Sequence, residues 1–353
     1  MNLINKIKFL LKRPKVVIVT GEGRACAKKA IFQVLKQYFK IDSEILIFDS
    51  DLTNSSYVET LRFFIKNSSL PVLVVTQVGD IPPEKDFFAG EKEKTLTIRK
   101  LAKTMPAQGF LVLNFDDETV REIKDYNPPT TPSHIITFGL QEGADFRASD
   151  IKLNTGTNFK INYKGNIVPV WLEKLFGKEQ VYSALVATAV GTIFDLNLVE
   201  ISQALKNYQS LPGKMKLIEG IKHSWILDDS ESANVFSMTE AIEILGKIQG
   251  FKRKIAVLGD IIGIGKYTIE AHEAIGERVA RNSDLLFTFG QRAKFIAQGA
   301  IQKGMVLEKI FQFDTINEGK LKLQDEIKEG DLILVDGSKE MEMAKVVEEI
   351  KAI

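Results

Sequence analysis

The first part of the chain alternates short apolar runs with longer segments of helical periodicity. Lys15–Thr20 is a β-rich run that ends at Gly21 and Gly23, and Lys28–Phe39 then places apolar residues at helical spacing. Further strands are predicted at Glu44–Phe48, Pro71–Thr76, Phe110–Asn114 and His134–Phe138, and helices at Tyr57–Asn67 and Glu91–Thr104. This alternation predicts an α/β domain with a mainly parallel sheet.

The pattern changes after the fifth predicted strand. Between Asp145 and Leu172 apolar and polar residues alternate about the turn Lys164-Gly165-Asn166, which predicts a β-hairpin flap. Two helices, Glu179–Phe194 and Leu198–Tyr208, then close the first domain, and Leu211–Gly213 form a hinge. We therefore expect one domain at residues 1–210 and a second at residues 211–353.

Beyond the hinge, β-rich runs again alternate with helical segments and loops. The predicted strands are Ser224–Asp228, Lys254–Leu258, Asp284–Phe289, Lys309–Phe313 and Asp331–Val335. This order predicts a smaller, Rossmann-like α/β domain.

The composition argues against nucleic-acid binding, an internal disulfide and a membrane span. The 353 residues carry 47 basic and 46 acidic side chains, so no charge bias toward nucleic acid is present. The single cysteine, Cys26, forbids an internal disulfide, and no run approaches the roughly 20 apolar residues of a membrane span. These features fit a reducing cytoplasm.

The N-terminal segment MNLINKIKFLLKRPK is basic and partly apolar. It lacks the long apolar core and small-residue cleavage site of a signal peptide. We predict a lead-in helix before the first strand; the alternative is a helix that lies on a membrane surface.

Four segments of the second half carry a family resemblance. They are LPGKMKLIEGIKHSWILDDSESANVFSM from Leu211, KIAVLGDIIGIG from Lys254, EAHEAIG from Glu270 and DLILVDGSKEMEM from Asp331. Together they resemble the C-terminal half of the Mur ligases, most closely the MurF type. The resemblance covers the family's central and C-terminal domains over about Lys15 to Ile350, and the N-terminal domain for the uridine nucleotide has no counterpart.

The resemblance implies an activity and its cofactors. Mur ligases use ATP and Mg²⁺ to form an acyl phosphate, and then join an amino acid or dipeptide to a peptidoglycan precursor. A cell-wall precursor or another cell-wall synthesis protein is therefore the expected partner.

The loop after the first strand departs from the P-loop that the family carries. Matching TGEGRACAKKA, from Thr20, to Thr-Gly-x-x-Gly-Lys-Thr puts Arg24 at the second glycine, Ala25 at the lysine and Cys26 at the magnesium-binding hydroxyl. Gly21, Gly23 and a helix start remain, which predicts a weak anion site. Arg24, Lys28 or Lys29 are the candidate substitute cations.

The same loop has an alternative interpretation. Gly21-x-Gly23-x-x-Cys26 partly matches the dinucleotide fingerprint, whose third position is Gly or Ala. This pattern would favour an NAD(P)-dependent oxidoreductase.

The family's magnesium ligands are also changed. Asp49, at the end of the second strand, either replaces a family glutamate or caps a turn. The histidine of a GPAH-like segment is missing from Gly79–Pro82. The lysine that is carbamylated in the family falls at Ile98, with Lys94 or Lys100 as alternatives if the helix is shifted.

The family's Gly-x-His-Asn…Asn signature resembles GKEQVYSAL, from Gly177. Glu179, Gln180 and Ser183 replace its polar trio. Together with the P-loop changes, this replacement predicts a degraded ATP and magnesium site.

The C-terminal domain keeps more of the pattern. The family's DDSYNANP segment reads here from Asp228 and Asp229 to Asn234, and adjacent strand residues point to opposite faces, so at most one aspartate can face a ligand. Asn234 contacts a ligand or caps a helix, and Ser237 with Glu240 has capping-box spacing.

Two lysines stand where the family has arginine. These are Lys214, after the hinge, and Lys339, after Ser338; lysine keeps the charge but loses bidentate geometry. The three histidines are isolated, so we predict no metal site, and His272 is expected to have a packing or helix-surface role.

The favoured hypothesis is a Mur ligase homologue with impaired or lost catalysis that acts by binding. An active ATP-dependent ligase that uses Arg24 and Lys28 is the alternative, and an oxidoreductase is the third.

Overall fold

The computed structural model describes residues 3–78, 89–124, 134–231 and 233–352; of residues 3, 89–94 and 124 only the backbone is described. The chain divides into two compact units. The first comprises residues 1–151, 158–172 and 178–209, and the second comprises residues 152–157, 173–177 and 210–353. No helix in the described ranges has the length and apolar character needed to cross a bilayer.

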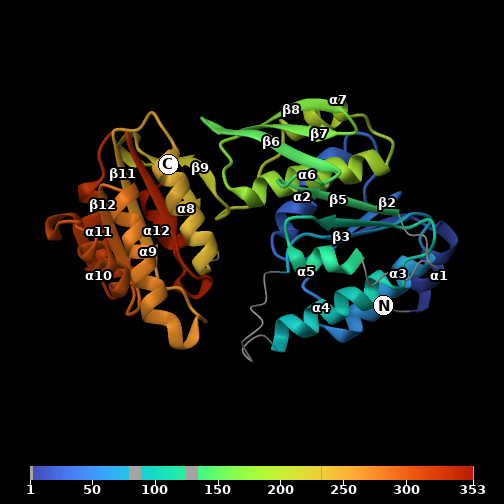
Figure 1. The fold of residues 1–353 in the computed structure, drawn as a ribbon, viewed down its shortest axis with the longest axis horizontal. Coiled ribbons are helices and arrows are strands. Elements are labelled where there is room, and N and C mark those ends of the chain that lie inside the picture. The colour runs from blue at the N-terminus through green and yellow to red at the C-terminus, as the bar shows by residue number, and fades with distance from the viewer. Residues whose placement is uncertain (1–2, 79–88, 125–133, 232, 353) are drawn as a thin grey trace. The chain divides into compact units, whose positions relative to one another are not determined.

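The first unit is built on β1 (Lys15–Thr20), which is buried from Val16 to Thr20. It pairs in parallel with β2 (Ile45–Ser50) and β3 (Pro71–Val75), and β4 (Phe110–Asn114) and β5 (His134–Gly139) extend the parallel sheet. The strand order is β2-β1-β3-β4-β5-β6-β7-β8 (Figure 1). The predicted mainly parallel α/β domain is confirmed.

The flap contains three strands, β6 (Phe146–Leu153), β7 (Gly156–Tyr163) and β8 (Asn166–Glu173). Their polar and apolar residues alternate, because one face of the strands is buried. The turn at Lys164-Gly165 was predicted from the sequence, but the tight turn at Asn154 and Thr155, closed by the Asn154 N–H on the Gly156 carbonyl at 2.9 Å, was missed.

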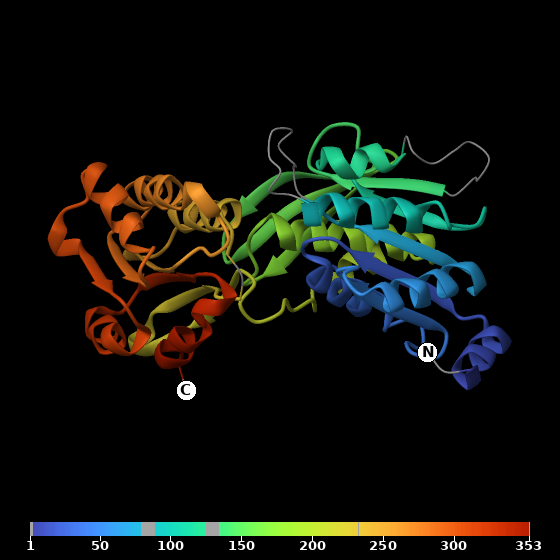
Figure 2. The same cartoon turned by 90° about the horizontal axis from the view of Figure 1, so that it is seen from below.

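Helices cover both faces of this sheet (Figure 2). The apolar cluster between the sheet and α3 (Ser55–Asn67), α4 (Ala89–Ala102) and α5 (Glu118–Arg121) includes Leu61, Ile98 and Val120. The remaining helices of the unit are α1 (Leu3–Lys12), α2 (Arg24–Leu35), α6 (Lys178–Ile193) and α7 (Leu198–Leu205).

The second unit has a six-stranded sheet in the order β13-β12-β11-β14-β10-β9. Its strands are β9 (Lys216–Glu219), β10 (Trp225–Asp229), β11 (Arg253–Gly259), β12 (Leu285–Phe289), β13 (Ile310–Phe313) and β14 (Asp331–Asp336). All neighbours pair in parallel except β9, which is antiparallel to β10. The sequence analysis missed β9, a four-residue edge strand too short to show a period.

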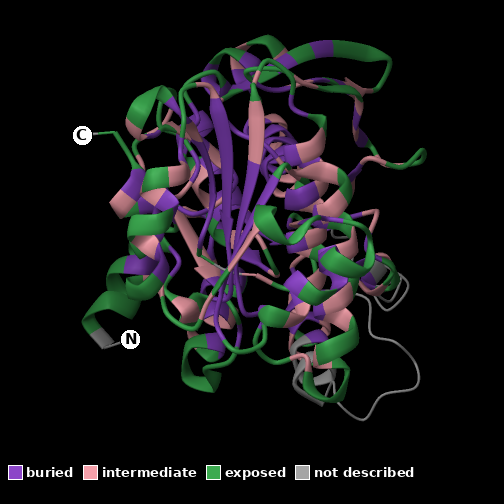
Figure 3. Cartoon of the chain, turned by 90° about the vertical axis from the view of Figure 1, so that its left-hand side faces the viewer, coloured by how far each residue is buried: buried purple, intermediate pink, exposed green. Residues whose placement is uncertain are grey.

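Five helices flank this sheet: α8 (Val235–Lys247), α9 (Thr268–Asn282), α10 (Lys294–Gln302), α11 (Ile316–Glu326) and α12 (Ala344–Ile350). Two apolar clusters lie on its opposite faces, one around Leu227 and Leu334 and the other around Ile226 and Val335. Figure 3 shows the buried central strands and the exposed outer faces of the helices. The polar residues at the carboxyl ends of these strands are therefore held on a rigid frame.

Candidate functional site

The loop between β1 and α2 is drawn tightly against the end of β3. Gly21 has φ 102° and Gly23 has φ 74°, both left-handed, and Gly23 precedes the first helical residue, Arg24. A Cβ on Gly21 would lie 2.6 Å from both Gln77 O and Thr76 Oγ1. The Glu22 N–H donates to Gln77 O at 2.7 Å, so this amide is already engaged by the segment that follows β3.

The candidate cations of the loop have carboxylate neighbours. Lys28 Nζ lies 2.7 Å from Asp49 Oδ1, and Arg24 Nη2 lies 4.0 Å from Asp51 Oδ2. Arg24 also donates to the Gly21 carbonyl at 3.3 Å. The structure thus brings Lys28 and Asp49 together. Because the two side chains are 41% and 31% exposed, the pair is worth only about 0.2–1 kcal/mol and can be displaced.

The charges of Lys28 and Asp49 affect the pKa of Tyr57 on α3. Burial raises the pKa of the Tyr57 hydroxyl, the Asp49 carboxylate raises it further, and Lys28 lowers it. The hydroxyl therefore stays protonated at neutral pH and can donate a hydrogen bond.

The two positions matched to the P-loop lysine and hydroxyl face different surroundings. Ala25 is exposed, whereas Cys26 is fully buried. Gln180 Nε2 lies 3.9 Å from Cys26 Sγ, and the Tyr208 hydroxyl lies 3.0 Å from Gln180 Oε1 and 3.3 Å from the Cys26 carbonyl. Cys26 and Gln180 therefore form part of the packing between α2 and α6, beneath the loop. Ser183 is also buried, with 2% of its surface exposed.

Glu179, in the first turn of α6, places its side chain beside Gly23 at the start of α2. A Cβ on Gly23 would be 3.0 Å from Glu179 Cγ and 3.7 Å from Glu179 Oε1. A carboxylate is favourable near the positive end of a helix dipole, and it repels a second anion at the same place. The helix start that would attract a phosphate is thus already complemented by the protein's own side chain.

The remaining first-unit candidates are dispersed. Ile98 is 2% exposed and belongs to the apolar cluster of the sheet, whereas Lys100 is exposed two residues further along α4. Two residues correspond to about 200° around a helix, so Lys100 does not share the direction of Ile98. The side chain of Lys94 and the segment Gly79–Pro82 lie outside the described residues. Lys29 is half-buried on α2.

Sequence reasoning missed a pair of carboxylates at the end of β4. Asp116 accepts the N–H groups of Leu140 at 2.6 Å and Gln141 at 3.0 Å, and the Tyr182 hydroxyl at 2.9 Å. The available signal was two adjacent aspartates, separated by Phe115 from the end of a buried strand. Asp117 accepts from Val78 and caps α5. These bonds hold three strand-end loops together.

In the second unit, Asp228 holds the hinge. Its Oδ2 accepts the Gly213 N–H at 2.9 Å, and its Oδ1 accepts the Ser230 hydroxyl at 2.6 Å. Gly213 has φ 66°, and a Cβ there would lie 2.5 Å from Glu231 Cγ, so glycine is required. Asp228 and Asp229 are both 6% exposed.

Asp336, at the end of β14, is a buried acid that the sequence analysis did not single out. It has no exposed surface, and neither carboxylate oxygen has a hydrogen-bond partner of good geometry among the described residues. Burial raises its pKa to about 8, and Asp228 adds to the shift, while the Gly337 N–H and the Lys214 ammonium oppose it. The folded protein therefore holds a proton on Asp336 at neutral pH.

The other second-unit candidates have structural contacts. Ser338 Oγ accepts the Ile262 N–H at 2.8 Å, and Lys339 beside it is exposed. Asn234 caps α8, where its Oδ1 accepts the Ser237 N–H at 2.9 Å and Ser237 Oγ accepts the Asn234 N–H at 2.9 Å. The predicted capping box of Ser237 and Glu240 is therefore wrong; the helix starts one residue after Asn234, so Ser237 occupies its third position.

His272 is buried on α9. Its Nδ1 lies 2.6 Å from the Thr268 carbonyl and its Nε2 accepts the Ile261 N–H at 3.1 Å, so the neutral Nδ1–H tautomer satisfies both bonds. Burial lowers its pKa. Across the described ranges, no group of three or more His, Cys, Asp or Glu side chains has the arrangement of a metal site.

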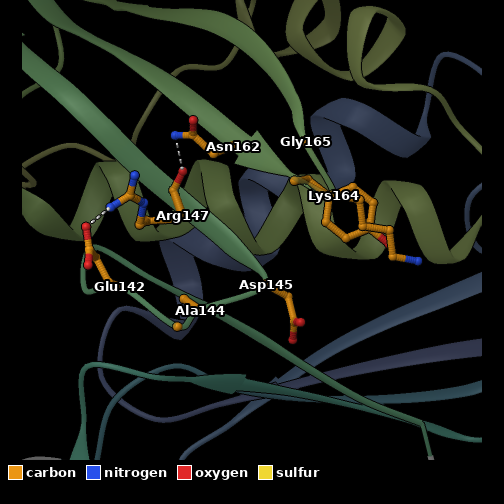
Figure 4. A pocket seen from close by; sticks show the side chains of 9 residues that line it. Glu142, Ala144, Asp145, Arg147, Asn162, Lys164 and Gly165 are labelled. Carbon is orange, nitrogen blue, oxygen red and sulfur yellow. Dashed lines mark hydrogen bonds and ion pairs between the residues drawn. The ribbon is translucent and has the colours of Figure 1, made fainter.

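A shallow pocket of about 320 Å³ lies between the loop that precedes β6 and the turn that joins β7 to β8 (Figure 4). Arg147 and Glu142 point toward one another across it, at 3.3 Å, and Asp145 accepts the Thr137 hydroxyl at 2.7 Å. The Lys164 ammonium lies over the Tyr163 ring. The charged side chains that line this pocket therefore mainly contact other groups of the protein.

Comparison with known proteins adds family matches in both units. The Mur ligase middle domain matches residues 86–191, and the Mur ligase, glutamate ligase domain matches residues 213–339. The UDP-N-acetylmuramoyl-tripeptide–D-alanyl-D-alanine ligase of Bacillus subtilis is 26% identical over 216 residues, which are 61% of this chain and 46% of the relative. The Escherichia coli ligase of the same name is 30% identical over 206 residues, 58% of this chain and 44% of the relative. The aligned region is thus about half the length of these relatives.

Solved structures show the same fold. MurF from Acinetobacter baumannii has a TM-score of 0.80 at 19% identity, covering 98% of this chain and 78% of that one. MurF ligase from Thermotoga maritima, solved in complex with ADP, has a TM-score of 0.76 at 19% identity, covering 98% and 81%.

Proposed function

Because this chain belongs to the Mur ligase family and is related to MurF, we propose that it acts in peptidoglycan precursor synthesis by binding, without forming amide bonds from ATP. The loop between β1 and α2 supports this proposal. Family members use ATP and Mg²⁺, but the residues here do not fit that pair. Ala25 offers no ammonium group, and the Cys26 side chain is buried against Gln180.

The electrostatics of the loop point in the same direction. The Glu179 carboxylate lies beside Gly23, where a phosphate would approach the start of α2. Lys28 is directed at Asp49, at 2.7 Å, which compensates its charge. A nucleotide would therefore have to displace one ion pair and tolerate a carboxylate, in exchange for few phosphate contacts.

The expected ligand is a precursor or a protein of cell-wall synthesis. Relatives are named for a UDP-N-acetylmuramoyl-tripeptide substrate, and the rigid sheets of both units are retained. In this proposal the polar residues of the second unit, among them Lys214, Lys339 and Asp229, bind a ligand but do not catalyse a reaction. The protein would do so in the cytoplasm, where such precursors are made.

Calorimetry of the purified chain with Mg-ATP tests the proposal, with Mg-ADP and NAD⁺ as comparators. We expect no binding at millimolar nucleotide. The matched gain-of-function variant is Ala25→Lys, at an exposed position, combined with Glu179→Gln, at a half-buried one, and it should bind Mg-ATP more tightly than the parent. Micromolar, magnesium-dependent binding by the parent chain, with ADP release in the presence of D-alanyl-D-alanine and the tripeptide precursor, would overturn the proposal.

A second candidate is an active ligase with unconventional phosphate ligands. It is favoured by the position of Arg24 and Lys28 in the first turns of α2 and by the modest strength of the ion pair with Asp49. This candidate predicts that Arg24→Ala and Lys28→Met each abolish ATP turnover, whereas Lys206→Met, an exposed control, does not. Turnover that survives both substitutions would remove this candidate.

A further inference from the structure

Helix α1 packs against the first unit through the aromatic ring of Phe9. Of the helix residues whose side chains are described, Phe9 is buried, at 6% exposure. Its ring lies 4.7 Å from the ring of Phe64 and 5.6 Å from that of Phe63 on α3. The Lys6 ammonium lies 5.6 Å from the Phe63 ring centre. In Figures 1 and 2 the helix lies at the periphery of its unit, beside α3.

The apolar stripe of α1 points away from this anchor. Ile4, Ile7, Leu10 and Leu11 are 63%, 48%, 45% and 81% exposed. With about 100° per residue, these four side chains span an arc of about 120°, and Phe9 lies about 160° from its centre. Apolar side chains that face solvent do not contribute to folding through burial. A contiguous exposed apolar stripe of this kind marks a surface that another molecule can cover.

Cations flank the stripe on both sides. On the same helical wheel, Lys8 and Lys12 follow Ile4 at about 40° and 80°, and Lys6 lies about 40° beyond Leu10. The sequence up to Pro14 contains Lys6, Lys8, Lys12 and Arg13 and no acidic residue, whereas the net charge of the whole chain is only +1. This segment is therefore locally basic, although the chain as a whole is nearly neutral.

We propose that α1 is a docking surface for an anionic lipid membrane, on which the helix lies parallel to the bilayer plane. The apolar side chains enter the boundary between headgroups and acyl chains, and the flanking cations contact lipid phosphates. A flat lipid surface suits a stripe flanked by cations on both edges. Such a short helix with one apolar stripe would bind weakly and reversibly.

Vesicle flotation tests this proposal with the full chain and with large unilamellar vesicles of phosphatidylcholine, with or without about 30% phosphatidylglycerol. We expect binding only to the anionic vesicles, weakened by added salt. The variant Ile7→Gln with Leu11→Gln should lose binding by at least about 10-fold. Lys8→Glu with Lys12→Glu should lose more than about 25-fold, since each basic residue near such a surface contributes a factor of about five.

The controls place the same changes elsewhere. Leu307→Gln with Leu321→Gln replaces two exposed leucines of the second unit, and Lys206→Glu with Lys266→Glu reverses two exposed lysines. Both controls should float like the parent. In a Leu11→Trp variant, quenching by brominated phosphatidylglycerol should report the depth of the helix.

Three results would overturn the proposal. The first is failure of the parent to float with anionic vesicles, and the second is equal flotation of the parent with neutral vesicles. The third is a parent that does not float but self-associates in sedimentation, when this self-association is lost in the Ile7→Gln, Leu11→Gln variant. The last result would assign the stripe to contact with a second copy of the chain. None of them depends on whether the loop after β1 binds ATP.

Discussion

Replacing Asp336 by asparagine should change how stability depends on pH. Burial raises the pKa of this carboxyl from 3.8 to about 8, so the folded chain keeps a proton that the unfolded chain releases. The stabilisation that this proton provides is complete below pH 3.8, and it is lost as the pH rises through about 8. Between these limits, the free energy of unfolding falls by up to about 1.4 kcal/mol for each unit by which the pH rises.

Asparagine has nearly the same shape and does not titrate. The variant should therefore lack this slope, and between pH 5 and pH 7 the parent should lose up to about 3 kcal/mol relative to it. The absolute stability of the variant is a poorer measure, because the new amide N–H₂ needs acceptors in a site where the carboxylate found no good partner. The comparison of slopes cancels this pH-independent term.

Urea unfolding at pH 5, 6 and 7 measures the slopes. Trp225 lies on β10, directly opposite Leu332 of β14, so its fluorescence reports the unit that contains Asp336. A Trp171→Phe background removes the second tryptophan, and Asp314→Asn serves as an exposed control. Parallel pH dependences for the parent and for Asp336→Asn would show that Asp336 is ionised in the folded protein and that its pKa is not raised.

Three further predictions concern the second unit. Burial lowers the pKa of His272, so the free energy of unfolding that depends on its neutral form is complete above pH 6.5 and falls as the pH drops below that value. The variant His272→Asn should weaken this pH dependence, measured in acid titrations followed by circular dichroism. Gly276→Ala should lower the melting temperature by several degrees or prevent folding, because its Cβ would lie 1.9 Å from the Ile296 carbonyl oxygen. Asn234→Ala should cost about 1 kcal/mol in urea unfolding through loss of the α8 cap, and Asn234→Ser should restore most of it.

Local sequence was sufficient where a single element carried the information. The apolar run Lys15–Thr20 and the glycines after it predicted β1 and its loop, because a buried parallel strand needs continuous apolar residues and a tight turn needs left-handed backbone. The same reasoning failed for β9, since four residues at a sheet edge show no period of their own. The helix cap predicted at Asn234 is confirmed, whereas the capping box was predicted one turn too late, at Ser237 and Glu240, because both Asn234 and Ser237 are good cap residues.

Local pattern predicted most of the helices and strands, the two mainly parallel sheets and the departures from the P-loop after β1, because each of these is encoded within a short segment. Only the tertiary structure decided which polar groups meet. Cys26 lies under Tyr208, 182 positions away, and Asp336 is buried near Asp228 and Lys214, so its proton depends on residues more than 100 positions earlier. Local pattern sets backbone conformation, whereas burial and partners, which set pKa values and binding, come from contacts between distant segments.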